Sequence, residues 1–125
     1  MGKITDFYQL DAWKENHKLA LMIYKKTSKF PKEETYGLTN QIRRAVSSIT
    51  ANIAEGFGRY HFADKIRFYH QSRGSSKEVQ NFIFLSKDLS YLEEKEAKKI
   101  WKQAKKGERL INGLIKSAEK QRNKR

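Results

Sequence analysis

The sequence predicts a single all-α domain folded as an antiparallel up-down-up-down four-helix bundle. Apolar and small residues recur at alternating spacings of three and four in four separate segments, as on one face of a helix. One proline and seven glycines are too few for the many turns of a β protein. The 125 residues suffice for one domain with its own core, so the absence of cysteine is no obstacle to folding.

The first helix is predicted from Asp11 to Ser28, after a flexible N-terminus of about residues 1–9. Asp11 is a suitable N-cap, and Phe30-Pro31 ends the helix because proline excludes helical geometry in the residue before it. The expected core seam is Leu10, Trp13, His17, Ala20, Tyr24 and Thr27. His17 is therefore interpreted as a structural core histidine.

The second helix is predicted from Glu34 to Glu55, with Gly56 as a left-handed C-terminal cap. Its expected seam is Leu38, Ile42, Ala45, Ile49 and Asn52. The third helix is predicted from Phe62 to Asp88. Its expected seam is Phe68, Ser72, Ser75, Val79, Phe82, Ser86 and Leu89.

The fourth helix is predicted from Glu93 to Gln121, and a basic tail is expected at about residues 119–125. The short connection 89–92 implies antiparallel neighbours. The seam is regular, and its small members Ala104 and Gly107 would let another helix approach closely. Its full set is Ala97, Ile100, Ala104, Gly107, Ile111, Leu114 and Ala118.

The third helix carries more apolar surface than one small chain needs. Phe82 to Leu85 are consecutive apolar residues, which point around most of a helix. We therefore expect a homo-oligomer. The candidate interface residues are Ile66, Tyr69, Ile83 and Phe84.

The charge predicts a polyanionic partner. Lys and Arg total 27 against 14 acidic residues, a net charge of +13, and residues 93–125 alone hold 12 basic and 5 acidic residues. Nucleic acid is the first expected partner and an anionic membrane the second, and a surface kept soluble by excess charge is the alternative to both. Of the two partners we predict nucleic acid and no membrane. The candidate binding residues are Arg59, Tyr60, Lys65, Lys116, Lys120, Arg122, Lys124 and Arg125.

No catalytic, cofactor or metal site is predicted. The Glu-x-x-His motif of di-iron bundles is missing at all three histidines, and there is no cysteine. Asn52 and Glu55 are interpreted as structural polar residues, with Arg43, Arg59 or Arg67 as the partner of Glu55. The start of the chain has no signal-peptide core, and Leu19–Tyr24 is too short to cross a membrane, so we expect a cytoplasmic protein.

Several motifs together resemble a known family. They are Phe30-Pro31-Lys32-Glu33-Glu34, Tyr36-Gly37-Leu38-Thr39, Gln41-Ile42-Arg43-Arg44-Ala45, Asn52-Ile53-Ala54-Glu55-Gly56-Phe57-Gly58-Arg59, Gly74-Ser75 with Glu78, and Lys87-Asp88-Leu89. They resemble the bacterial four-helix bundle proteins encoded by intervening sequences in large-subunit ribosomal RNA genes. The accessory variability proteins of diversity-generating retroelements are similar to these proteins.

The resemblance implies a homopentameric ring, and its retroelement members bind nucleic acid and a reverse transcriptase. Two functions are therefore expected. The first is a non-enzymatic, basic, homo-oligomeric accessory protein that binds DNA or RNA with low sequence specificity. The alternative is a scaffold that docks a reverse transcriptase or another acidic protein and has no direct nucleic-acid role.

Overall fold

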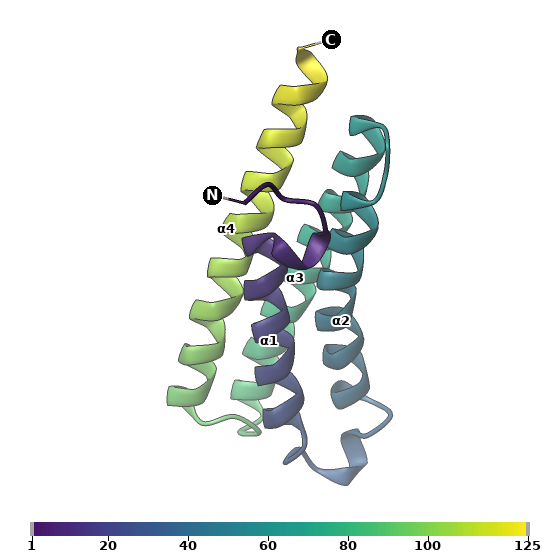
Figure 1. Cartoon of the computed structure of the whole chain (residues 1–125). Helices are drawn as coiled ribbons and strands as arrows, with labels where there is room; N and C mark the ends of the chain where they lie inside the picture. The colour runs from purple at the N-terminus through teal and green to yellow at the C-terminus, as the bar shows by residue number, and fades with distance from the viewer. Residues whose placement is uncertain (1, 125) are drawn as a thin grey trace.

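The computed structural model describes residues 2–124, which form helices joined by short connections, with no strand in that range (Figure 1). The α-helices are α1 (Asp11–Thr27), α2 (Leu38–Phe57), α3 (Phe62–Asp88) and α4 (Glu94–Asn123). Two short 3-10 helices, η1 (Phe7–Gln9) and η2 (Lys32–Glu34), precede α1 and α2. The all-helical prediction and the number of long helices are confirmed, and the predicted bounds of α3 agree with the structure at both ends.

The four helices surround one apolar core. α1 and α3 each pack against both α2 and α4. The centre is filled by fully buried side chains from all four helices, among them Leu19, Ile42, Ile49, Val79 and Ile111. Figure 1 shows that the C-terminal part of α4 extends beyond the start of α1, so one side of its last turns is uncovered. No helix within residues 2–124 is both long and apolar enough to span a membrane.

The predicted core seam of the first helix is wrong by one residue from Trp13 to Tyr24, and its last member, Thr27, is buried as predicted. The buried residues of α1 are Ala12, Asn16, Leu19, Ile23 and Thr27. Trp13 is only half-buried, and His17 is exposed, with its ring stacked 4.5 Å from that of Trp13. Two neighbouring stripes of α1 are apolar, and both repeat at spacings of three and four, so spacing alone did not separate them.

α2 begins four residues later than predicted. Residues 32–34 form the separate 3-10 helix η2, and the Glu34 carboxylate accepts hydrogen bonds from Leu38 N (3.1 Å) and the Tyr91 hydroxyl (2.8 Å). The first of these bonds satisfies an amide in the first turn of α2, where intrahelical acceptors are absent. Glu34 therefore caps α2 from outside the helix.

Gly56 has a different role from the predicted left-handed cap. It lies inside α2, is buried, and no glycine among the described residues has a positive φ. A Cβ at this position would lie 2.8 Å from Cε1 of Tyr69 and 3.0 Å from Cβ of Phe68. The missing side chain therefore allows α3 to pack closely against the end of α2.

The predicted seam of α4 is largely correct. Its buried residues include Ala97, Ile100, Ala104, Gly107, Ile111 and Ala118, while Ile115 is buried in place of the half-buried Leu114. Gly107 sits directly against Asn16, whose Nδ2 donates to the Gly107 carbonyl oxygen (3.3 Å). The predicted tail is helical as far as Asn123, and η1 orders part of the predicted N-terminal segment by packing Phe7 on Trp13.

Candidate nucleic-acid interface

A groove lined by cationic side chains runs between α1 and α4. It consists of two adjoining cavities of about 430 and 380 Å³, which share Lys18, Met22 and Lys99. Ile100, which is buried, and Met22, which is half-buried, provide the apolar part of the lining. The remaining lining residues are Lys25, Lys26, Lys95, Glu96, Lys102, Gln103, Lys106 and Arg109.

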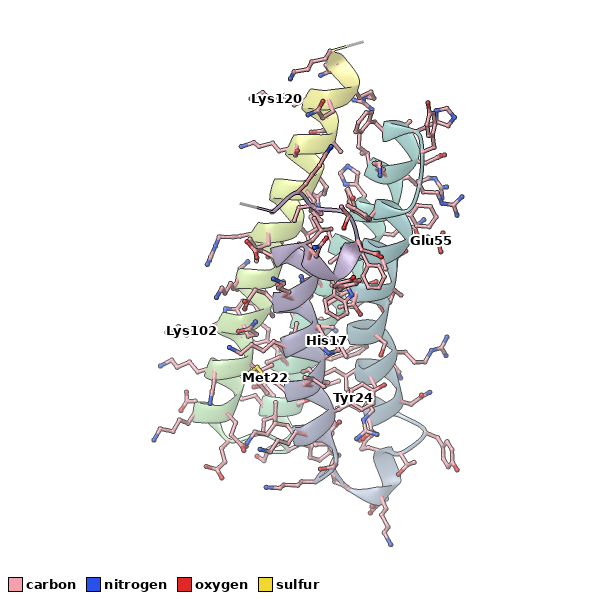
Figure 2. All side chains as sticks on the ribbon, in the orientation of Figure 1. His17, Met22, Tyr24, Glu55, Lys102 and Lys120 are labelled. Carbon is pink, nitrogen blue, oxygen red and sulfur yellow. The ribbon has the colours of Figure 1, made fainter. Side chains whose placement is uncertain are left out.

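The α4 side of this groove belongs to a longer line of basic residues, which we call the cationic stripe. Its members are Lys95, Lys99, Lys102, Lys106, Arg109, Lys116 and Lys120. Apart from the step from Arg109 to Lys116, they follow one another at spacings of three and four, so they share one side of the helix. Figure 2 shows Lys102 and Lys120 projecting from the same side of α4, while Glu55 lies at the opposite edge of the bundle.

Two carboxylates lie in or beside the groove, and both are already engaged. Glu15 accepts a hydrogen bond from Gln103 (3.0 Å) and pairs with Lys106 (3.3 Å). Glu96 pairs with Lys26 at 2.6 Å. The pKa of Glu15 is lowered first by the Gln103 hydrogen bond, and that of Glu96 first by the Lys26 hydrogen bond, so both stay ionised at neutral pH.

Most of the cations along the groove and stripe have no carboxylate partner. Within residues 2–124, ion pairs are absent at Lys18, Lys25, Lys95, Lys99, Lys102, Arg109, Lys116 and Lys120. Lys18 still interacts electrostatically with Glu15 at longer range, but none of these cations forms a direct ion pair in the described part of the chain. A row of uncompensated cations along a groove attracts and holds a polyanion.

The residues at the end of α2 and the start of α3 that were predicted to bind nucleic acid are mostly engaged within the chain. Arg59 pairs with Glu55 (3.0 Å) and lies over the Phe68 ring. The ammonium of Lys65 donates to the Phe57 carbonyl oxygen at 2.6 Å, and burial lowers the pKa of Lys65. This lysine therefore caps the C-terminus of α2. Tyr60 is 82% exposed.

Lys116, Lys120 and Arg122 are exposed on the last turns of α4, and Lys124, the residue that follows the helix, is exposed as well. Arg125 lies outside the described residues. The sequence reasoning found two members of the cationic stripe but missed the others and the lysines of α1 that face them. The sequence does contain a pattern that predicts the stripe, because basic residues of the fourth helix repeat at spacings of three and four beside the apolar seam.

Three of the four predicted interface residues are already buried within a single chain. Ile66, Tyr69 and Ile83 are 7%, 4% and 2% exposed in a single chain, so they belong to its own core. In the apolar run 82–85, Ile83 points inward and Phe84 outward, because successive helical residues are about 100° apart. Phe84 is 52% exposed and packs edge-on against Trp101 at 5.0 Å between ring centroids.

Phe84 and Trp101 border an apolar hollow of about 170 Å³ between the end of α3 and the start of α4. Its other lining residues are Ile83, Lys87, Glu94, Ala97 and Lys98. Leu85 and Leu89, exposed by 43% and 45%, lie on the same end of α3. Of the predicted interface residues, only Phe84 belongs to this exposed apolar group.

Asn52 and Glu55 make local contacts. Asn52 is half-buried, and its Nδ2 donates to the carbonyl and hydroxyl oxygens of Ser48, one turn earlier in the same helix. The residue of α2 that points into the core there is Ile53, so Asn52 does not belong to the core seam as predicted. Of the three partners considered for Glu55, the structure shows Arg59.

The polar centre of the bundle lies elsewhere, at Glu108 of α4. Its carboxylate accepts hydrogen bonds or ion pairs from Lys77 (2.8 Å), Lys105 (2.9 Å) and the buried Gln80 (3.2 Å). Burial would raise the pKa of Glu108, but these three donors outweigh it and lower the pKa to about 2. Sequence reasoning missed this cluster because its members come from two helices.

No three histidine or acidic side chains in the described part of the chain converge as metal ligands would. Two surface features stand out in the described part of the chain: the row of cations without ion pairs on one side of the bundle and the small apolar hollow at one end.

Residues 8–113 match the model of the family described as 23S rRNA-intervening sequence protein. The chain belongs to this family. The match covers most of the chain and confirms the resemblance inferred from its motifs. A comparison with curated proteins finds no match.

Among solved structures, the chain is similar to a protein from Bacteroides thetaiotaomicron that is described as having unknown function and belonging to the S23 ribosomal protein family. The two share 20% sequence identity, with 84% of this chain and 95% of that one covered and a TM-score of 0.77. At this identity the likeness concerns the fold, and it agrees with the helical bundle described above.

Proposed function

We propose that this family member is a non-enzymatic protein that binds nucleic acid through the groove between α1 and α4. The observation that carries the proposal is the row of cations without carboxylate partners on both sides of the groove, such as Lys18 on α1 and Lys99 and Lys102 on α4. Lysines that each contact a phosphate release condensed counterions, which favours binding without reading sequence.

A charge-reversal experiment tests this proposal. Lys99→Glu combined with Lys102→Glu should weaken binding to DNA and RNA by about tenfold or more at low salt, because two phosphate contacts become repulsive. The matched control is Lys32→Glu combined with Arg44→Glu, which changes the net charge equally at exposed positions away from the groove. Equal losses in both variants would mean that only net charge matters and that the groove is not the binding site.

We also propose that copies of the chain associate through the apolar end of α3, with five subunits as the number the family resemblance favours. Phe84, Leu85 and Leu89 are apolar side chains exposed at one end of this helix. An antiparallel up-down-up-down order is supported by the contacts of Lys26 with Glu96 and of Asn16 with Gly107. In that order the exposed end of α3 lies beside the start of α4 and leaves the cationic stripe accessible.

Light scattering coupled to gel filtration tests the association. The expected mass is a multiple of 14.7 kDa, and Phe84→Glu should lower it, since a carboxylate in an apolar interface is strongly unfavourable. Tyr36→Glu is the control, because Tyr36 is 94% exposed in the connection between α1 and α2. A parent protein that is monomeric at micromolar concentration would contradict the association.

A protein-docking scaffold is the second candidate function. The hollow beside Phe84 and Trp101 is apolar and is flanked by Lys87 and Lys98, which suits an apolar side chain from an acidic protein such as a reverse transcriptase. The two functions separate in one measurement. The scaffold function predicts that the parent protein shows no salt-dependent binding to nucleic acid. It also predicts that the protein binds an acidic protein partner and that Phe84→Glu abolishes this binding.

A further inference from the structure

The cationic stripe contains one position without a side chain. Gly113 lies between Arg109 and Lys116, at the spacings of four and three that the rest of the stripe follows. It is exposed, and a Cβ there would have nothing within 4 Å. Packing inside the chain therefore does not require a glycine, although glycine within a helix costs about 1 kcal/mol relative to alanine. The gap allows an external molecule to come closer to the helix backbone than it could elsewhere along the stripe.

The length of the stripe indicates what that molecule is. From Lys95 to Lys120 the stripe extends about 38 Å at a rise of about 1.5 Å per residue. One turn of a B-form DNA duplex is about 34–36 Å long, and both phosphate backbones pass any straight line along it within that length. A duplex also presents about twice the axial charge density of one strand, which favours it on a rod-like row of cations.

The surroundings of the stripe argue against recognition of separated bases. Proteins that bind single strands combine a basic groove with aromatic side chains on which bases stack. Neither cavity of the groove has an aromatic residue in its lining. The exposed Tyr24 lies on the α2 side of α1, where its hydroxyl meets Ser47, and Tyr36 and Tyr60 lie in connections between helices.

We propose that the cationic stripe binds the phosphate backbones of double-helical nucleic acid, with Gly113 as the point of closest approach. This inference rests on the proposed function and adds the class of nucleic acid and the residue at which it comes nearest. Contacts to backbones alone also imply weak dependence on base sequence.

The test compares a 20-base-pair duplex, as DNA and as RNA, with a single-stranded oligothymidine of equal strand length at the same salt. We expect the parent protein to bind both duplexes about tenfold or more tightly than the single strand. Gly113→Leu should reduce duplex binding at least about fivefold, because a branched side chain blocks close approach to the helix.

Gly74→Leu is the matched control, since Gly74 is also helical, exposed and open, but lies on α3 outside the stripe. It should leave binding unchanged, and helix content by circular dichroism should be retained in both variants. Equal or tighter binding to the single strand, or equal behaviour of the two leucine variants, would overturn this inference while leaving nucleic-acid binding intact. Loss of all salt-dependent binding in the parent protein would overturn the proposed function as well.

Discussion

The two sides of α4 carry similar residues in opposite surroundings. On the side that faces the bundle, Gly107 is pressed against Asn16, and Glu108 gathers Lys77 and Lys105 around one buried carboxylate. Every charge there has a partner, and the glycine is required by a close contact between helices. These residues serve the stability of the fold.

On the outward side, a Cβ added at Gly113 would have no atom of another element within 4 Å, and Lys99 and Lys102 form no ion pair within residues 2–124. Nothing in the fold explains either the missing side chain or the unbalanced charge. The comparison shows that the lysines paired with Glu108 gather on the inward side of α4, whereas Lys99 and Lys102 lie on its outward side. Lysines that hold the bundle together can thus be distinguished from lysines that are available to a partner.

The largest effect is expected on the inward side. Glu108→Ala should lower the free energy of unfolding by about 3 kcal/mol, because it leaves the buried amide of Gln80 and two ammonium groups without their acceptor. Urea unfolding measures this loss. Glu119→Ala is the control, since Glu119 forms no ion pair in the described structure and should change the free energy by less than about 0.5 kcal/mol.

A pH titration should reveal the same carboxylate. The folded pKa of Glu108 is about 2, against an ordinary value of 4.5, so its contribution is complete above about pH 5 and is lost as the pH falls toward 2. By pH 3 the loss should be about 2 kcal/mol. Glu15 and Glu96 shift in the same direction, so the measurement is the difference between the parent protein and Glu108→Gln across this range. A constant difference from pH 6 to pH 3 would contradict the cluster.

The two glycines of α4 should respond to alanine with opposite signs. A Cβ at Gly107 would lie 2.8 Å from Cγ of Asn16, so Gly107→Ala should destabilise the protein by about 1–3 kcal/mol. Gly113→Ala fills open space and should stabilise it by up to about 1 kcal/mol through helix propensity. Thermal unfolding of the two variants side by side tests this. The same sign for both would mean that the two sides of α4 do not differ as the structure indicates.

Much of the fold was predictable because its signals are local. The bounds of α3 and most of the seam of α4 follow from spacing along one helix. The seam of α1 was not recovered because Trp13, His17 and Tyr24 form a second stripe with the same period as the buried one. Only packing against α2 and α4 shows which of the two stripes is inside.

The candidate site was less predictable because it lies between helices. Lys116 and Lys120 were found from the charge of the chain's end, but the groove requires knowing that Lys18 of α1 faces Lys99 of α4. The Glu108 cluster joins residues 28 positions apart for the same reason. The apolar run 82–85 was correctly singled out, yet only the burial of Ile83 and the exposure of Phe84 show which of its residues a partner can reach.

The smallest effect on stability is expected where the charge is least balanced. Lys99→Gln combined with Lys102→Gln removes two positive charges from one side of α4. The repulsion of Lys99 by Lys95 and of Lys102 by Lys106, each four residues apart, is thereby abolished. Each such pair destabilises a helix by about 0.2–0.5 kcal/mol, so the variant should be unchanged or more stable by about 0.5 kcal/mol at low salt.

High salt should erase this gain by screening the repulsion. The control is Lys77→Gln, which removes a partner of Glu108 and should destabilise the protein at every salt concentration. The measurement is urea unfolding of the three proteins at low and high salt. A clear loss of stability in the Lys99 and Lys102 variant would mean that these lysines support the fold. A stabilising role would then explain the two lysines without a binding partner. A neutral or stabilising effect would leave binding as the role of the stripe.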